Sequence, residues 1–280
     1  MYLDAPKPED LQALADFLEL GSVAVLTGAG LSTESGIPDY RGPEAYKRPR
    51  RPVQYQEFLK NAAARRRYWA RSMLGWPRFA RARPNAGHFA LRDLEQRGLI
   101  SGIVTQNVDS LHAAAGSETA VELHGALRDT ICLDCGRLMP RDELQAELER
   151  LNDYLIHADV ALAPDGDADL DDERLAAFRV VDCECGGRLK PHVVFFGENV
   201  PKPRVERALG LVAEARALLV VGSSLTVWSG YRFVRAAAER GQAVAIVGLG
   251  PTRGDADASL RVAGGAGVTL TGLCERLCAA

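Results

Sequence analysis

Four short, mainly apolar runs recur along the chain, and each has the length of a strand. They cover residues 23–26, 100–105, 217–221 and 243–247. Apolar runs without polar alternation are typical of strands that are covered on both faces, as in a parallel sheet. We therefore predict that these four runs form the centre of one parallel sheet.

Segments of helical character precede the strands. Apolar residues recur at helical spacing between Leu11 and Leu18, and Gly21 follows as a stop signal. Three further segments of helical length, rich in Ala, Leu, Arg and Glu, cover residues 85–96, 203–215 and 231–240. Because strands alternate with helices, we predict an α/β fold with a doubly wound, Rossmann-like parallel sheet.

Two stretches interrupt this alternation. Residues 43–83 are dense in arginine and aromatic residues, which predicts helices outside the sheet. Residues 127–190 hold two close pairs of cysteines, a polar helix near residues 141–151 and an acidic loop at residues 163–169. We expect both stretches to form one small second domain, and the sheet domain to consist of residues 1–42, 84–126 and 191–280.

Composition and charge exclude several classes of protein. The chain has 280 residues, of which 47% are hydrophobic and 25% charged, and a net charge of −3. These values are those of a globular protein and argue against a disordered chain or a protein that holds nucleic acid by phosphate charge. No apolar run approaches the roughly 20 residues of a membrane span, and the first twenty residues are too acidic for a targeting peptide. We expect a cytoplasmic protein.

Four of the six cysteines indicate a metal site. Cys132 and Cys135 form one close pair and Cys183 and Cys185 another. In a reducing compartment such pairs are typical of metal binding, and four thiolates suit the tetrahedral geometry of zinc. We predict one structural zinc ion on these four residues, with buried thiols that bind no metal as the alternative.

A glycine-rich segment follows the first predicted strand. Glycines at positions 28 and 30 let backbone N–H groups approach a pyrophosphate. Thr33 stands where a third glycine of the usual dinucleotide fingerprint would fall, so a conventional dehydrogenase fits poorly. A plain tight turn is the alternative, but the polar residues that follow, Asp39 and Arg41 among them, favour a ligand site.

Polar side chains also follow the second strand. Gln106, Asn107 and Asp109 stand where α/β sheets bind ligands, and their amide and carboxylate groups suit a ribose and a carboxamide. Alternatively, Asn107 and Asp109 cap a short helix at residues 110–115. His124, after a further short strand, offers a general base near neutral pH, with a structural imidazole as the alternative. We assign a structural role to His88 and His112.

Six motifs, in this order, resemble the signature motifs of the sirtuins, which are NAD-dependent protein-lysine deacylases. They are GAGLSTESGIPDYRG at residues 28–42, TQNVDSLH at 105–112, ELHG at 122–125, KPHVVFFGE at 190–198, GSSL at 222–225 and GPTR at 250–253. Tyr40 after Asp39, the YWAR run at residues 68–71, GWP at 75–77 and the loop at 162–167 resemble the class II branch, which includes bacterial and mitochondrial members.

The resemblance implies a reaction in which the acyl oxygen of a modified lysine attacks the nicotinamide ribose of NAD. The products would be free lysine, nicotinamide and O-acyl-ADP-ribose. It implies His124 as the base that removes a ribose proton, and Asn107 and Asp109 as its catalytic partners. The residues implied for NAD binding are Gly28, Ala29, Gly30, Ser35, Ile37, Asp39, Tyr40, Arg41, Gln106, Asn107, Asp109, His124, Gly222, Ser223, Ser224, Gly248, Leu249 and Ala266.

The resemblance also implies how the substrate is held. A peptide would pair as an added strand against residues 194–198 and 228–231. The implied substrate residues are Val194, Phe196, Gly197 and Glu198, with Tyr68 and Arg71 at the acyl group. We expect acylated lysine in proteins or peptides as the partner, no membrane or nucleic acid, and a monomer. Mono-ADP-ribosyl transfer to protein and a non-catalytic module that binds NAD or acyl-lysine are the alternatives.

The chain departs from the usual sirtuin pattern at three places. Family members usually carry Asp at the position of His192 and Asn at that of Gly248. The loss of that amide should weaken the hold on the adenosine ribose by about 1 kcal/mol. The second cysteine pair is usually C-x-x-C, whereas Cys183 and Cys185 are separated by one residue only.

Overall fold

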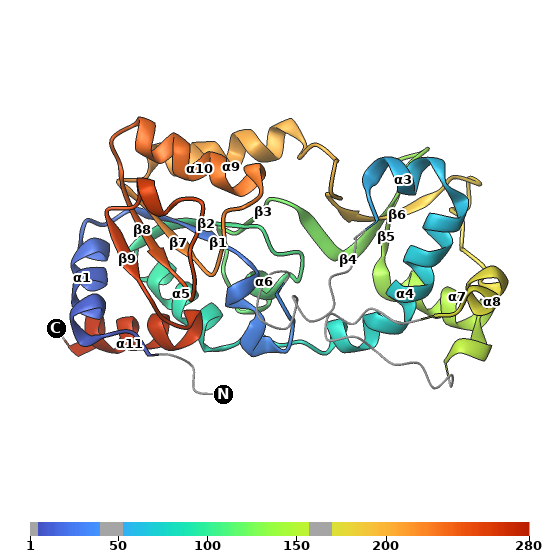
Figure 1. Ribbon diagram of the computed structural model, residues 1–280, viewed down its shortest axis with the longest axis horizontal. Helices are drawn as coiled ribbons and strands as arrows, with labels where there is room; N and C mark the ends of the chain where they lie inside the picture. Colours follow the sequence, from blue (N-terminus) through green and yellow to red (C-terminus); the bar gives the residue numbers. More distant parts are fainter. Residues whose placement is uncertain (1–4, 40–52, 157–169, 280) are drawn as a thin grey trace. The chain divides into compact units, whose positions relative to one another are not determined.

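The computed structural model describes residues 5–39, 53–156 and 170–279. The chain divides into two compact units (Figure 1). Unit 1 comprises residues 1–41, 83–124 and 200–280, and unit 2 comprises residues 42–82 and 125–199. Among the described residues, no helix combines the length and the apolar character that crossing a bilayer requires.

Unit 1 is built on a six-stranded parallel sheet with the order β3-β2-β1-β7-β8-β9. The prediction of a doubly wound parallel sheet is confirmed, and the four apolar runs form its four central strands. The strands are β1 (Val23–Thr27), β2 (Ile100–Thr105), β3 (Val121–Glu122), β7 (Ala217–Val221), β8 (Ala243–Val247) and β9 (Leu260–Val262).

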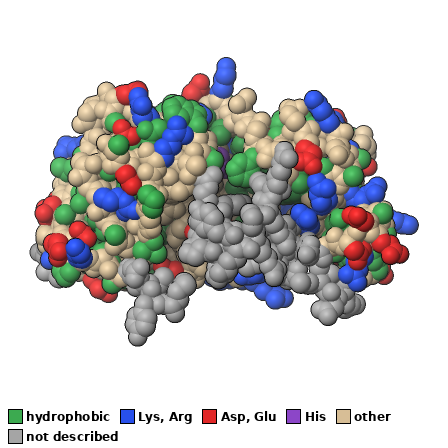
Figure 2. Space-filling view, viewed as in Figure 1, with side chains coloured by type: hydrophobic (Ala, Val, Ile, Leu, Met, Phe, Trp, Pro, Cys, Tyr) green, Lys and Arg blue, Asp and Glu red, His purple; other side chains and the backbone are tan. Residues whose placement is uncertain are grey.

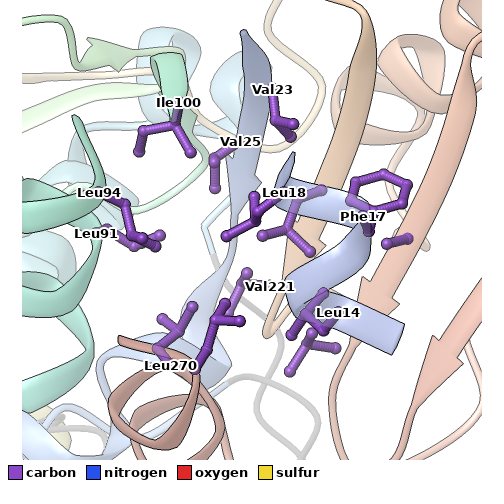
Figure 3. Packing of buried hydrophobic residues seen from close by; sticks show 14 of the residues in the cluster. Leu14, Phe17, Leu18, Val23, Val25, Leu91, Leu94, Ile100, Val221 and Leu270 are labelled. Carbon is purple, nitrogen blue, oxygen red and sulfur yellow. The ribbon is translucent and has the colours of Figure 1, made fainter. Parts of the chain in front are cut away.

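Helices cover both faces of this sheet, which explains why its central strands are mainly apolar. Val23 and Val25 of β1 pack in one hydrophobic cluster with α1 (Pro8–Glu19), α5 (Ala86–Gln96) and α11 (Ala266–Ala279) (Figure 3). The alternate residues Ala24 and Leu26 pack in a second cluster with α9 (Lys202–Glu214) and α10 (Trp228–Glu239). Since side chains alternate between the faces of a strand, both sets must be apolar.

The segment after Gly28 forms two short 3₁₀ turns, η1 (Ala29–Leu31) and η2 (Thr33–Ser35). The predictions for residues 228–231 need correction. α10 begins at Trp228, three residues before the start expected at residue 231. Residues 228–231 therefore form the first turn of a helix and offer no strand edge to a peptide. The short helix expected at residues 110–115 is α6 (Leu111–Ala114).

Unit 2 combines helices with a small antiparallel sheet of order β5-β4-β6. Within unit 2, Trp69 is buried and donates from its indole N–H to the carbonyl of Leu189 at 3.3 Å. The strands are β4 (Gly125–Cys132), β5 (Leu138–Pro140) and β6 (Leu189–Val193), and the helices are α3 (Tyr55–Lys60), α4 (Ala62–Ala80), α7 (Arg141–Leu151) and α8 (Asp172–Ala177), with a 3₁₀ turn η3 (Asp153–Leu155).

Candidate functional site

Two glycine loops meet at the carboxyl ends of β1 and β7 in unit 1. The N–H of Gly30 donates to the carbonyl of Gly222 at 2.9 Å. A Cβ on Gly30 would lie 2.9 Å from that oxygen, and one on Gly222, whose φ is +63°, would lie 2.6 Å from the nitrogen of Leu31. Both glycines are thus required for the close approach of the two loops, in addition to any role toward a phosphate.

Asn107 and Asp109 are joined through Ser32, a residue that the sequence motifs did not single out. The amide of Asn107 donates to the hydroxyl of Ser32 at 3.0 Å and to the carbonyl of Gly28 at 3.1 Å. The Ser32 hydroxyl donates to the Asp109 carboxylate at 2.7 Å. The loop after β1 and the loop after β2 are therefore held together by side-chain hydrogen bonds.

Asp109 also accepts a hydrogen bond from the backbone N–H of Leu111 at 2.9 Å. Asp109 thus contacts the first residue of α6 from the position before the N-cap, Ser110, and this bond coexists with the contact to Ser32 because a carboxylate has two oxygens. Burial raises the pKa of Asp109 from its ordinary value, while the two hydrogen bonds oppose that shift.

Gln106 links the ends of β2 and β7. Its side-chain amide donates to the hydroxyl of Ser223 at 2.7 Å. The Ser223 oxygen also accepts from the backbone N–H of Leu225 at 3.2 Å. Ser224 lies beside it, and its hydroxyl is 3.1 Å from that of Thr226. Three of the residues expected at the NAD site, Gln106, Ser223 and Ser224, thus lie at neighbouring strand ends.

His124 is held by both ring nitrogens. Nδ1 lies 2.9 Å from the carbonyl oxygen of Gln106, and Nε2 lies 2.8 Å from the hydroxyl of Ser229. Because a carbonyl only accepts, Nδ1 carries the hydrogen and the Nε2 of the neutral ring offers its lone pair. Burial lowers the pKa of His124, which keeps the ring neutral and able to accept a proton at neutral pH.

The lowered pKa of His124 predicts where activity is lost in acid. A base acts only when it is unprotonated, so kcat/KM should fall as the pH drops through the pKa of His124 in the free enzyme. Since burial lowers that pKa, we expect the midpoint of the acidic limb to lie below the ordinary histidine value of about 6.5. A pH profile of kcat/KM measures this midpoint, and one above 6.5 would contradict the prediction.

His88 and His112 have structural surroundings, as the sequence analysis assigned. Both are buried, and their ring centroids lie 5.1 Å apart. The His112 Nε2 lies 2.9 Å from the hydroxyl of Thr27, at the end of β1. Burial lowers the pKa of His88 to about 4 and that of His112 to about 3, so both rings are neutral at physiological pH.

The other residues expected to bind NAD lie on two segments of unit 1. Ser35 accepts a hydrogen bond from the amide of Asn85 at 3.0 Å, and the N–H of Ile37 donates to the carbonyl of Ser32. Ala29 is the first residue of η1, and Asp39 is the last described residue of this segment. Tyr40 and Arg41 lie outside the described residues.

Gly248 and Leu249 follow β8, and Ala266 begins α11. Leu249 is exposed. Arg261 donates to the carbonyl of Gly248 at 3.0 Å and to that of Gly250. The loop that carries Gly248 in place of the usual amide is thus fixed from β9 by a guanidinium group.

In unit 2, the residues expected to bind the peptide follow β6. Glu198 accepts a hydrogen bond from the N–H of Phe195 at 2.8 Å and pairs with the ammonium group of Lys190 at 3.0 Å. The Lys190 side chain is 5% exposed, so this ion pair fixes the turn between β6 and Glu198 in a buried place. Val194, Phe196 and Gly197 lie on that turn, and Phe196 is exposed.

Tyr68 packs against the same turn. Its ring centroid lies 5.2 Å from that of Phe195 and 5.5 Å from that of Phe58. Tyr68 and Arg71 are both partly buried on α4. The structure therefore brings the residue expected at the acyl group, Tyr68, next to the segment expected at the peptide.

The four cysteine sulfurs form one cluster, also in unit 2. All four Sγ atoms lie within 4.8 Å of one another. The Cys132–Cys185 and Cys135–Cys183 sulfur pairs are 3.6 and 3.8 Å apart. Sulfurs on a tetrahedral zinc ion with bonds of about 2.3 Å would be separated by about 3.8 Å, so these residues fit a structural zinc.

A tight glycine turn closes this cluster despite the short second pair. The N–H of Cys183 donates to the carbonyl of Gly187 at 2.8 Å, and Gly186 has a φ of +78°. A Cβ on Gly187 would lie 2.6 Å from the sulfur of Cys132. The backbone N–H of Cys135 lowers the pKa of Cys132 to about 7, which favours the thiolate that a metal binds.

Comparison with known proteins gives the same family from sequence and from structure. The sequence profile described as "Sir2 family" matches residues 28–229. The chain is 56% identical over 273 residues to "NAD-dependent protein deacetylase 1" of Streptomyces coelicolor. The matched residues cover 97% of this chain and 91% of that protein. The chain is 47% identical over 260 residues to the bovine "NAD-dependent protein lipoamidase sirtuin-4, mitochondrial", covering 91% and 82%.

Solved structures agree with these relatives. A structure titled "Sir2 bound to acetylated peptide" matches with a TM-score of 0.73 and 29% identity, and covers 96% of this chain and 99% of its own. One titled "Sir2-p53 peptide-NAD+" matches with a TM-score of 0.70 and 31% identity, covering 95% and 96%. The chain therefore belongs to the Sir2 family of NAD-dependent protein deacetylases, in the class II branch of bacterial enzymes and mitochondrial sirtuin-4.

Proposed function

We propose that this chain removes acyl groups from lysine side chains of proteins by transferring them to the ADP-ribose part of NAD, with release of nicotinamide. One observation carries the proposal: the ring of His124 is neutral and fixed on the carbonyl of Gln106, and its Nε2 is a hydrogen-bond acceptor, engaged here by the hydroxyl of Ser229. The loops that hold Asn107, Asp109 and Ser223 lie at the strand ends around it. A module that only binds NAD has no need of such a base.

Some residues of the site bind and orient NAD, and one residue, His124, transfers a proton. NAD supplies the ribose that loses nicotinamide and then accepts the acyl group. Asn107 and Asp109, connected through Ser32, orient polar groups of that ribose and its carboxamide. His124 removes a proton from a ribose hydroxyl at Nε2, so that the oxygen can attack the acyl carbon. The glycine loops at Gly30 and Gly222 leave backbone N–H groups close to the pyrophosphate.

Nicotinamide release tests the proposal against its rivals. With NAD and an acetyl-lysine peptide, the protein should release nicotinamide and free lysine in equal amounts, and release without peptide should be small. Transfer of labelled ADP-ribose to protein at a comparable rate would favour a mono-ADP-ribosyltransferase instead. Binding of NAD or acyl-peptide with no release of nicotinamide would leave only the non-catalytic module.

We infer that the acyl site also accepts acidic acyl chains. Tyr68 and Arg71 lie three residues apart on α4, so both project from the same side of the helix. Tyr68 packs against the turn proposed for the peptide, and a guanidinium group suits bidentate contact with a carboxylate. The alternative is that Arg71 belongs to a solvated basic helix face.

Arg71→Ala should lower kcat/KM for succinyl- and glutaryl-lysine peptides at least tenfold more than for acetyl-lysine. The reason is that loss of a charge-assisted hydrogen bond is worth about 1.5–3 kcal/mol, and an acetyl group makes no such bond. Parallel kinetics on the three peptides measure the difference. Arg78→Ala, on the same helix, is the matched control. An equal loss on all three peptides would exclude recognition of the acyl carboxylate by Arg71.

We also propose the remaining assignments made from the sequence. We place NAD on the sheet domain, unit 1, and zinc on the small domain, unit 2, which includes residues 191–199, expected from the sequence in the sheet domain. The partners are acylated lysine residues of proteins or peptides, and the chain acts as a monomer in a reducing compartment such as the cytoplasm. Acidic and basic side chains of the described residues are interspersed on the face shown in Figure 2, so that face offers no continuous basic surface to nucleic-acid phosphates.

A further inference from the structure

The Nε2 atom of His124 is already engaged, by a residue outside the motifs that define the site. Ser229 lies in the first turn of α10, and its hydroxyl is 2.8 Å from Nε2. Since Nδ1 carries the ring hydrogen, bonded to the carbonyl of Gln106, the Ser229 hydroxyl is the donor and the Nε2 lone pair the acceptor. Two contacts from different elements thus fix the plane of the imidazole.

The residue after Ser229 makes the second contact of this turn. A Cβ on Gly230 would lie 2.3 Å from the side-chain oxygen of Gln106, so a larger residue there would displace that side chain. Gln106 in turn supplies the carbonyl that holds Nδ1. The first turn of α10 therefore contacts the base directly through Ser229 and supports its other anchor through Gly230.

We propose that Ser229 is a positioning residue for His124, which holds Nε2 in the direction of the substrate hydroxyl and yields that place when the substrate binds. The proposal rests on the proposed function, because the hydroxyl concerned is that of the ribose. It assigns to the start of α10 a role in proton transfer in addition to its place in the fold.

The proton transfer balances with these groups alone. The O–H bond of the ribose hydroxyl breaks, and an N–H bond forms at Nε2 with the lone pair that Ser229 had occupied. The Ser229 hydroxyl then rotates, and its oxygen accepts a hydrogen bond from the new N–H of the imidazolium, while Nδ1 keeps its bond to Gln106. The charged groups that act on the ring are Arg204 of α9 and Arg232 of α10, which both disfavour the imidazolium. The Ser229 oxygen therefore stabilises the imidazolium form of His124 by accepting a hydrogen bond, whereas the two arginines disfavour that form.

Two reactions of the same enzyme separate this role from a structural one. Exchange of labelled nicotinamide into NAD, in the presence of acyl-peptide, reports the step before the base acts. Formation of free lysine requires the base as well. A residue that only positions His124 should affect the second reaction and spare the first, whereas a residue that only supports the fold should affect both.

Ser229→Ala should lower kcat for lysine formation about five- to tenfold and leave the exchange rate within about twofold of wild type. Ser229→Thr, which keeps the hydroxyl, should restore lysine formation to within about threefold. Ser259→Ala is the matched control, because that hydroxyl donates to the carbonyl of Val244 and lies in the segment before β9. It should change neither reaction, and melting temperatures of all three variants check the fold.

Lysine formation by Ser229→Ala within twofold of wild type would overturn the proposal, and so would an equal fall of both reactions. Failure of Ser229→Thr to restore the rate, in a variant that melts like wild type, would also overturn it. If the wild-type protein itself shows no exchange that depends on acyl-peptide, the proposed function fails instead, and the two failures are thereby distinguished.

Discussion

His124→Ala is expected to lower kcat for deacylation by about 10²- to 10⁴-fold, the range that a positioned general base contributes. The ring is held by Gln106 at Nδ1, and its Nε2 accepts a hydrogen bond from Ser229 that a substrate hydroxyl can replace. NAD affinity should change little, because the base acts after both substrates are bound. Steady-state kinetics at saturating substrate, with titration of NAD binding, measure both effects.

A second variant separates the base from its hydrogen bonds. In His124→Gln, the side chain keeps a donor and an acceptor of similar reach but cannot take up a proton near neutral pH. We expect it to be as impaired in deacylation as His124→Ala, while nicotinamide exchange persists in both. If either variant kept more than about a third of the wild-type deacylation rate, the role assigned to His124 would be wrong.

The sheet could be predicted from the sequence because its signal is local. The central strands are mainly apolar on both faces, since Val25 faces the cluster with α1 and α5 while Leu26 faces the cluster with α9 and α10. A strand covered on both faces shows no alternation of polar and apolar residues, so a continuous apolar run is enough to predict it. The family motifs follow the carboxyl ends of these strands, where a parallel sheet exposes its loops to ligands.

The local errors arose where a distant contact decides the backbone. The segment Val227–Gly230 contains a β-branched residue, a tryptophan and a glycine, which by themselves favour an extended chain over a helix. In the structure it is the start of α10, where Gly230 lies against Gln106, over a hundred positions earlier in the chain. The turns after Gly28 are shaped in the same way by contact with Gly222.

Ser32 and Ser229 were missed for a related reason. A serine carries no signal of its own, and the partners of these two, Asp109 and His124, lie far from them in the sequence. Ser32 could have been found within the first motif, since it lies between residues already assigned to NAD. Ser229 lay within residues 228–231, expected at the peptide, but nothing in the sequence connected it with His124, because that contact depends on the position of α10 in space.

In the cysteine cluster, the sequence shows an unusually short spacing between Cys183 and Cys185, but the structure still brings the four sulfurs together. The pair Cys183 and Cys185 is one residue shorter than the usual C-x-x-C, yet the four sulfurs approach one another at distances that suit zinc. The turn through Gly186 and Gly187 brings the second cysteine pair close to the first, because Gly187 has no side chain and its backbone can lie against the sulfur of Cys132. Whether four cysteines can surround a zinc ion therefore depends more on the conformation of the backbone between them than on their spacing in the sequence.

Removal of zinc is expected to unfold unit 2 and abolish activity without any direct part in the chemistry. We expect one zinc ion per chain, held by four thiolates that leave no open position for a catalytic water. The four ligands join the end of β4 to the turn before β6, so their loss frees both segments. Metal binding that requires the folded site contributes directly to folding free energy. Metal analysis of the purified protein and melting with and without a chelator measure this.

Single variants test which residues hold the zinc ion, which a chelator cannot show. Cys132→Ser should lose the metal and lower the melting temperature by about 10 °C or more, the shift expected for several kcal/mol in a protein of this size. Gly187→Ala should also lose zinc, because the added Cβ would lie 2.6 Å from the Cys132 sulfur. Gly210→Ala, where a Cβ on α9 meets nothing within 4 Å, is the matched control and should keep the metal. Active protein with well below one zinc per chain would mean that packing alone holds unit 2, and that the four sulfurs lie close together without a metal to bind.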